Sequence, residues 1–233
     1  MKSSSIFLFI LFWVVLFIDC SLIMSGKSDY RVYTKILLVP ILLINIYNAS
    51  LDTKHKISKA LINLAFLFCF LGDFSLLWDN DNTFFILGLV SFLIAHICFC
   101  IFFYRLKKFK DKYRLFLFAA GFLTYGYIGT ILFLNWQGIM RQNMQIPVII
   151  YGVIIGSMLL TAIHAGNNKS IKRLARIYFI PGALLFIISD SILALHKFSL
   201  AVTYGLVSSV AIMVTYGAAI FLIAMGAIRF LKK

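Results

Sequence analysis

Charge is what this sequence has least of. Only 13% of its residues are Asp, Glu, Lys or Arg, against roughly one quarter in a soluble domain. Apolar residues make up 62% of the chain and come in long unbroken runs. A chain with so few polar residues cannot form the surface of a soluble domain, so the composition indicates a polytopic membrane protein.

The apolar runs lack period-2 alternation, which argues against a transmembrane β-barrel. Backbone groups in lipid must be paired within the segment, so runs of about 20 apolar residues predict helices. The expected fold is an all-α bundle of eight transmembrane helices. Its connections are short, so residues 1–233 are expected to form a single polytopic domain. The predicted spans are residues 5–24, 32–48, 59–78, 83–104, 113–135, 146–165, 177–197 and 200–229.

The net charge of +14 indicates topology rather than nucleic-acid binding. An eight-span chain has both termini and its second, fourth and sixth loops on one side, and 17 of the 22 basic residues fall there. The positive-inside rule then predicts a multi-pass protein of the cell membrane with both termini cytoplasmic. The remaining five are Lys27, Arg31, Lys35, Arg141 and Lys197.

Patterns of metal ligands are also lacking. The four cysteines lie inside the predicted spans, where a thiol behaves as a small apolar side chain, and Cys98 and Cys100 point to different helix faces. Three histidines, His55, His164 and His196, fall near loops at different levels. The sequence therefore predicts neither a zinc site nor any other metal site.

Two aspartates lie within apolar runs, Asp73 in the third span and Asp190 in the seventh. A carboxylate in hydrocarbon costs several kcal/mol unless it is paired, protonated or hydrated, so these positions indicate function. At 1.5 Å per residue, both lie roughly 7 to 10 Å below the outer boundary. Other polar residues near this depth predict a shared pocket, with the last two deeper at its floor: Asp19, Lys35, Tyr127, Tyr151, His96 and Tyr216.

A faint internal repeat accompanies the two aspartates, which are 117 positions apart. At the same offset, Gly88-Leu89-Val90-Ser91 matches Gly205-Leu206-Val207-Ser208. Short matches of this kind also arise by chance. A true repeat would make helices 1–4 and 5–8 parallel repeats about an axis along the membrane normal, with the two aspartates face to face.

Each polar residue also has a purely structural interpretation. The two aspartates could bridge helices through hydrogen bonds, and His96 is as often an interhelical donor as a proton-transfer group. Lys35 either extends to the outer surface or pairs with a carboxylate or a phosphate. Tyr151 and Tyr216 are expected chiefly to pack, with their hydroxyls satisfied.

An ordered set of positions spans nearly the whole chain. It comprises Thr34-Lys35 and Pro40; Leu71-Gly72-Asp73, Phe85, Gly88-Leu89, Phe92 and His96; Tyr151 and Met158; Gly182-Ala183, Phe186, Ser189-Asp190-Ser191 and Phe198; and Thr215-Tyr216. In this order the set resembles the YhhN-type lysoplasmalogenases, a family of small eight-span membrane proteins. Ile36 and Ile220 depart from the Pro and Gln that the family usually has there.

The resemblance implies a metal-independent ether hydrolase that cleaves the vinyl ether bond of lysoplasmalogens to a fatty aldehyde and a glycerophospho head group. Protonation of the outer vinyl carbon gives an oxocarbenium ion that water attacks, so the site needs one acid and one nearby anion or base. The substrate would be a lysophospholipid in the bilayer, with no cofactor and no obligate protein partner. The expected catalytic residues are Asp73, Asp190 and His96, and the expected substrate-binding residues are Lys35, Tyr151 and Tyr216.

The competing interpretation is a proton- or cation-coupled small transporter that uses the same aspartate pair. Intramembrane polar residues are few, however, and Pro181-Gly182 is the one good candidate for an unwound helix. A receptor-like bundle is a weaker third alternative.

The charge asymmetry generates a topological prediction. Reporter fusions after Lys110 and Lys233 should both give a cytoplasmic signal, and a fusion after Asn80 should give an external one. An external C-terminus would contradict the eight-span arrangement and the depths assigned to the aspartates.

Overall fold

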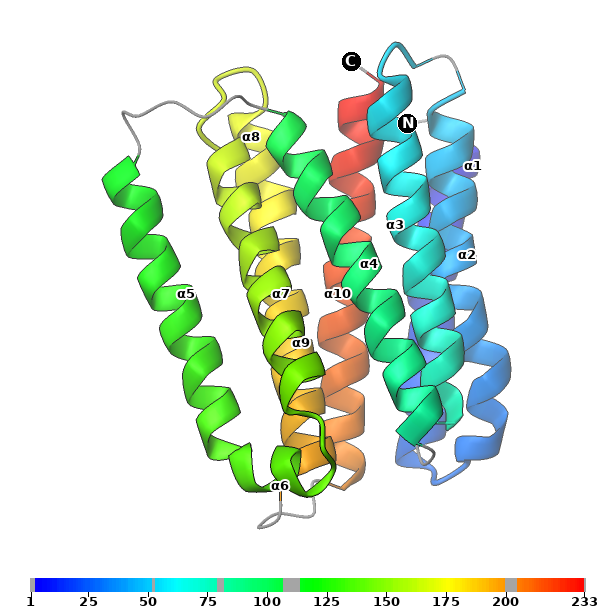
Figure 1. Cartoon of the computed structure of the whole chain (residues 1–233). Helices are drawn as coiled ribbons and strands as arrows, with labels where there is room; N and C mark the ends of the chain where they lie inside the picture. Colours follow the sequence, from blue (N-terminus) through cyan, green and yellow to red (C-terminus); the bar gives the residue numbers. More distant parts are fainter. Residues whose placement is uncertain (1–2, 52, 79–81, 107–113, 200–204, 233) are drawn as a thin grey trace.

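The structure is a computed structural model that describes residues 3–51, 53–78, 82–106, 114–199 and 205–232. All regular secondary structure in these residues is helical, and eight helices are long and apolar enough to cross a membrane. These helices run side by side as a bundle (Figure 1). The predicted all-α class and the eight spans are confirmed. The fusion positions Lys110, Lys233 and Asn80 lie outside the described residues.

The observed spans lie close to the predicted ones. They are α1 (Ser3–Met24), α2 (Arg31–Ala49), α3 (Lys56–Ser75) with the 3-10 turn η2 (Leu76–Trp78), α4 (Asn82–Arg105), α5 (Arg114–Leu134), α7 (Gln145–Ala165), α9 (Ile180–Phe198) and α10 (Leu206–Leu231). Shorter elements are η1 (Ser28–Tyr30), α6 (Trp136–Arg141), α8 (Lys172–Leu174) and η4 (Ala175–Phe179). The eighth span was predicted from residue 200, but residues 200–204 lie outside the described ones.

The seventh span differs most from its prediction. It begins at Lys172 instead of residue 177, because α8, η4 and α9 follow one another without a break. The segment η4 is π-helical, and Pro181 follows in the first turn of α9, where a missing N–H is tolerated. The chain therefore stays helical at Pro181-Gly182, where an unwound point was considered, and the irregularity is a π turn just before it.

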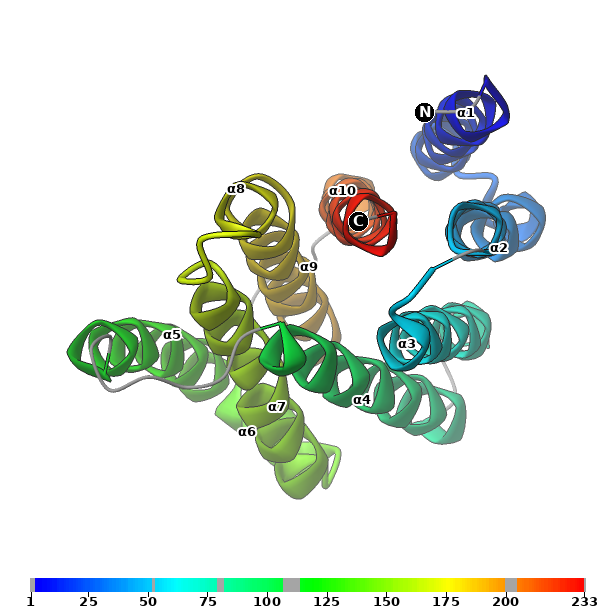
Figure 2. The same ribbon diagram turned by 90° about the horizontal axis from the view of Figure 1, so that it is seen from above.

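Seen from above, α10 lies between α9 on one side and α2 on the other (Figure 2). Several helix contacts correspond in the two halves of the chain: α3 packs along α4 and α9 along α10, while α4 contacts α7 and α10 contacts α2. A parallel repeat of four helices would produce this correspondence. The internal repeat of four helices stays a prediction, because helix contacts alone do not establish it.

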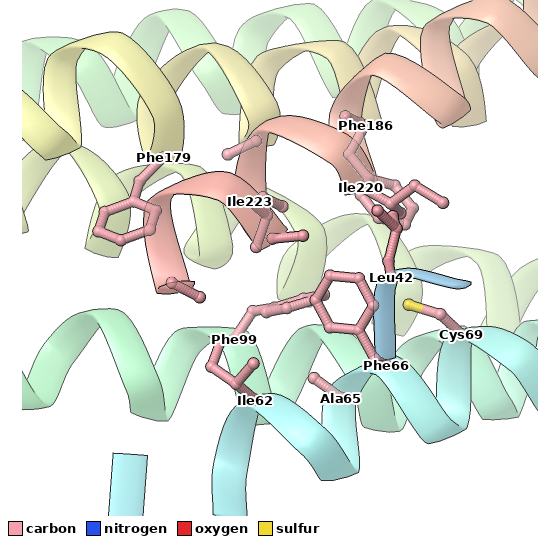
Figure 3. Close-up of a cluster of buried hydrophobic side chains, with 14 of the residues drawn as sticks. Leu42, Ile62, Ala65, Phe66, Cys69, Phe99, Phe179, Phe186, Ile220 and Ile223 are labelled. Atoms are coloured by element: carbon pink, nitrogen blue, oxygen red, sulfur yellow. The ribbon is translucent and has the colours of Figure 1, made fainter. Parts of the chain in front are cut away.

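The core of the bundle is apolar and rich in phenylalanine. Side chains from different helices meet there, among them Leu42, Phe66, Phe99, Phe186 and Ile220 (Figure 3). All five are fully buried. In contrast, α5 lies at the edge of the bundle and is the least buried of the eight spans. The helices that surround the two aspartates are therefore the tightly packed ones.

Close approach of α9 and α10 depends on Gly182. A Cβ atom at this position would lie 2.8 Å from Cγ1 of Ile223 and 3.1 Å from the backbone oxygen of Ala219. Small residues at such contacts let helix backbones pack closely, and this packing is what holds helices together in lipid.

We therefore expect Gly182→Ala to destabilise the protein by about 1–3 kcal/mol, because the added methyl group overpacks the α9–α10 contact. Gly126 is the matched control, since it is exposed on α5 and a Cβ atom added there would meet no neighbouring atom within 4 Å. Gly126→Ala should leave stability unchanged or raise it slightly. Thermal unfolding of the two purified variants measures the difference, and equal melting temperatures would contradict this account of the contact.

Candidate active site

A cavity with a volume of about 520 Å³ lies between α2, α3, α4, α9 and α10. This volume is in the range of small-molecule binding sites. Four of the predicted site residues line it together: Lys35, Asp73, Asp190 and Tyr216. Its other polar or aromatic lining residues include Asp29, Arg31, Trp78, Phe92, Ser189, His196 and Ser209.

Asp73 lies on α3 and is only 2% exposed. The hydroxyl of Tyr216, on α10, donates a hydrogen bond to its Oδ2 atom at 2.7 Å. The preceding residue makes room for the ring that closes this side of the cavity, because a Cβ atom at Gly72 would lie 2.6 Å from the Phe92 ring. Glycine before the aspartate thus lets α4 approach α3 beside the buried carboxyl.

Asp190 lies on α9, and its side chain is 17% exposed. The hydroxyl of Tyr151, on α7, donates a hydrogen bond to Oδ2 of Asp190. The Nε2 atom of His96 lies 2.9 Å from the Tyr151 hydroxyl and 3.7 Å from Oδ2 of Asp190. Because the tyrosine proton points to the carboxyl, Nε2–H of the histidine is the donor to the tyrosine oxygen. The three side chains form a chain of hydrogen bonds that ends on the carboxyl.

His96 was predicted at the floor of the pocket, and this part of the prediction is wrong. The side chain is fully buried behind Tyr151, and the described residues that line the cavity do not include it. Its Nδ1 atom has no hydrogen-bond partner among the described residues. His96 therefore acts on the cavity only through Tyr151 and Asp190, whereas Tyr216 does line the cavity.

Aromatic rings hold these polar groups in place. The Phe186 ring packs edge-on against His96, with centroids 4.6 Å apart, and against Tyr216 at 5.4 Å. The Phe92 ring meets Tyr216 at 5.8 Å, again nearly perpendicular. Edge-to-face contacts of this kind favour one ring orientation. The two tyrosine hydroxyls are thus aimed at the carboxyls by a packed apolar shell.

A second, apolar pocket of about 50 Å³ adjoins the cavity and shares Asp190 with it. Its side chains come from α4, α7 and α9 and include Leu89, Val148, Ala194 and Phe198. Tyr151 lines this pocket instead of the large cavity. Asp190 consequently stands where a polar space and an apolar space meet.

Sequence reasoning also placed Tyr127 wrongly and missed Arg31. Tyr127 was expected in the pocket, but it is 43% exposed on α5 and faces a separate apolar groove. Arg31 was counted only as an outer basic residue, yet it lines the cavity and pairs with the buried Asp19. The available signal was its spacing of four from Lys35, which places both on one face of α2.

The described residues hold no group of three or more His, Cys, Asp or Glu side chains that could bind a metal ion. The acidic groups of the cavity are aspartates, and two of them accept hydrogen bonds from tyrosine hydroxyls. The arrangement places two carboxyls in one cavity and supplies a phenol to orient each of them.

Comparison with known proteins places these residues in a family. The family model described as the YhhN family matches residues 30–227, a range that contains every predicted site residue. The chain belongs to the YhhN family. The family resemblance inferred from the ordered positions is thereby confirmed.

Two curated relatives are lysoplasmalogenases, one from Mycobacterium bovis and one from Mycobacterium tuberculosis. Each is 30% identical to this YhhN-family chain over 116 residues, which is 50% of this chain and 41% of the relative. The match thus spans less than half the length of these relatives. No solved structure matches the chain.

The Tyr216–Asp73 hydrogen bond generates a stability prediction. Tyr216→Phe removes the donor and leaves the buried carboxyl without this bond, so we expect a loss of about 1–3 kcal/mol. Tyr33→Phe is the matched control and should change little, because Tyr33 is 72% exposed on α2. Thermal unfolding of the two variants measures the effect. If Tyr216→Phe is as stable as Tyr33→Phe, the hydrogen bond does not support the buried aspartate.

Proposed function

We propose that this protein hydrolyses the vinyl ether bond of lysoplasmalogens. One observation carries the proposal: Asp73 and Asp190 line one cavity inside the membrane bundle, and each accepts a hydrogen bond from a tyrosine hydroxyl. Membership of the YhhN family and the name of the curated relatives support the same activity.

The reaction divides into protonation of the double bond, addition of water and collapse of the hemiacetal that forms. One aspartic acid gives its proton to the outer carbon of the C=C bond, and the C–O carbon becomes an oxocarbenium ion. The other aspartate stabilises this cation and accepts a proton from the water that attacks it. The resulting hemiacetal collapses with transfer of a proton to the glycerol oxygen, and the C–O bond to the aldehyde carbon breaks. The products together contain the substrate plus one water.

The two spaces that meet at Asp190 suit the two ends of such a lipid. The polar cavity takes the glycerophospho part, with Lys35 toward the phosphate, and the apolar pocket beside Asp190 takes the first carbons of the alkenyl chain. In this pose the vinyl ether lies next to the carboxyl. Tyr151 and Tyr216 contact both the substrate and the aspartates, and His96 positions Tyr151. A lysophospholipid in the bilayer is the partner molecule, and the proposed chemistry uses side chains of the protein and one water molecule.

The topology proposed with this function keeps both termini in the cytoplasm and the protein in the cell membrane. The start of α1 and the end of α10 lie at the same end of the bundle (Figure 1). The cavity lies toward the opposite end, where Asp29 and Trp78 line it. The positive-inside rule makes that opposite end the outer one, so lysolipid would enter from the outer leaflet.

Coupled transport by the same aspartates is not favoured. The described residues show no pair of broken helices of the kind on which many secondary transporters rely; their spans contain the π turn η4 and, at the end of the third span, the 3-10 turn η2. Family membership favours the hydrolase.

Removal of either carboxyl should abolish the reaction. Asp73→Asn and Asp190→Asn keep the side-chain shape but cannot donate an acidic proton or carry charge, so we expect vinyl ether cleavage to fall by at least about 100-fold in each. Asp52→Asn is the matched control, since Asp52 comes between α2 and α3 in the sequence. Aldehyde release from a lysoplasmalogen by the purified proteins is the measurement. Full activity of either cavity variant would contradict the paired mechanism.

Two comparisons sharpen this test. His96→Gln should slow the reaction without ending it, because the histidine positions Tyr151 and does not line the cavity. Ester-linked lysolipids should be poor substrates, since the proposed site uses acid–base chemistry on a vinyl carbon and no activated Ser, Cys or Thr nucleophile. Proton or cation flux through liposomes without aldehyde release would instead support the transporter.

A further inference from the structure

We propose that Arg31 and Lys35 together bind the phosphate of the lysolipid, and that the buried Asp19 positions Arg31 for this contact. The inference rests on the proposed function for its ligand, and it assigns a head-group site that includes a residue outside the expected set. Both basic residues line the cavity that holds Asp73 and Asp190.

The spacing of the two cations suits a phosphate group. Arg31 is the first residue of α2, and Lys35 follows one helical turn later, about 6 Å along the axis. Residues four apart lie on the same helix face, so both side chains meet one ligand. The N-terminal end of α2 adds partial positive charge at the same place.

Asp19 positions Arg31 and leaves N–H donors of its guanidinium free to bind a ligand. Its Nη2 atom lies 3.5 Å from Oδ2 of Asp19, whose side chain is fully buried on α1. The hydroxyl of Thr34 donates to the other oxygen of Asp19 at 2.7 Å, which fixes the carboxylate. A guanidinium has five N–H donors, and the contact with Asp19 is made by its Nη2 atom. The Nε–H of Arg31 is buried without a hydrogen-bond partner among the described residues.

The cavity that holds the two cations is also lined by three carboxylates, those of Asp29, Asp73 and Asp190. Arg31 lies at the start of α2 and is 22% exposed at its side chain, whereas Asp73 is 2% exposed. Arg31 and Lys35 supply two positive charges that offset the repulsion between a bound phosphate and these carboxylates. The glycerol backbone then bridges from the cations to the aspartates, and the vinyl ether reaches Asp190. Arginine also offers a planar pair of donors that matches two phosphate oxygens.

Binding of uncleavable lipids tests this site separately from catalysis. The ligands are 1-O-alkyl-glycerophosphoethanolamine and 1-O-alkylglycerol of the same chain length, whose saturated ether bonds the proposed reaction cannot cleave. Affinity is measured by isothermal titration on the full chain in lipid nanodiscs. The wild-type protein should prefer the phosphate ligand. Arg31→Gln should weaken binding of that ligand about 10- to 100-fold and leave binding of the alkylglycerol unchanged.

Two further variants identify the cause. Arg31→Lys keeps the charge but loses the planar donor pair, so it should retain part of the preference. Lys27→Gln removes an exposed charge in the loop after α1 and should change neither affinity. Equal weakening for both ligands in Arg31→Gln would mean that the arginine only ties α1 to α2, and unchanged affinity for both would also overturn the phosphate site.

The source of the phosphate is tested by competition. Inorganic phosphate at millimolar concentration should not displace the alkyl phospholipid, because the chain and the glycerol contribute to its binding. Displacement would show a site for free phosphate and would overturn the assignment to a lysolipid. Absence of vinyl ether cleavage with the predicted binding preferences intact would refute the proposed hydrolase and leave the phosphate site standing.

Discussion

Two carboxyl groups placed among hydrocarbon are the constraint on which the centre of this protein depends. An aspartate in lipid costs several kcal/mol unless a donor, a cation or water compensates for it. Tyr216 supplies the donor for Asp73, and Tyr151 supplies it for Asp190. The cavity supplies space for water and for a ligand. The same arrangement that makes the aspartates tolerable therefore leaves them beside an open volume of about 520 Å³.

The surrounding apolar structure holds that arrangement. Gly72 lets Phe92 pack against α3, Gly182 lets α9 meet α10, and Phe186 presses on both His96 and Tyr216. In lipid, such close packing replaces the hydrophobic effect as the force between helices. The helices that carry the site are thus the well-packed ones, while α5, which contributes none of the lining residues of the large cavity in the described chain, lies at the edge. Rigidity here keeps the hydroxyls aimed at the carboxyls, which acid–base chemistry needs.

The spans were predictable because a run of about 20 apolar residues has few alternatives in a membrane. The two aspartates were predictable for the same reason, since a charge stands out in such a run. Their partners were not: Tyr216 is 143 positions from Asp73, and Tyr151 is 39 from Asp190. Which tyrosine meets which aspartate depends on the rotation of each helix about its axis. Depth alone therefore placed Tyr127 in the pocket although its helix faces elsewhere.

Helix rotation also explains why Arg31 was missed and why His96 was placed too close to the cavity. The depth of a residue does not specify the direction of its side chain. Arg31 faces the cavity, whereas His96 faces the interior and contacts Tyr151. The π turn before Pro181 shows a similar limit, since proline predicts an irregularity without specifying which kind.

Deuterium incorporation into the aldehyde product tests most directly whether a carboxyl group of the aspartate pair protonates the vinyl ether. Cleavage in D₂O, with immediate reduction of the aldehyde to the alcohol, should place one deuterium on the carbon next to the former aldehyde. That deuterium should have a single configuration, because a carboxyl group fixed in the cavity protonates one face of the double bond. An equal mixture of the two configurations would mean that no fixed acid of the protein delivers the proton, and it would contradict the role of the aspartate pair.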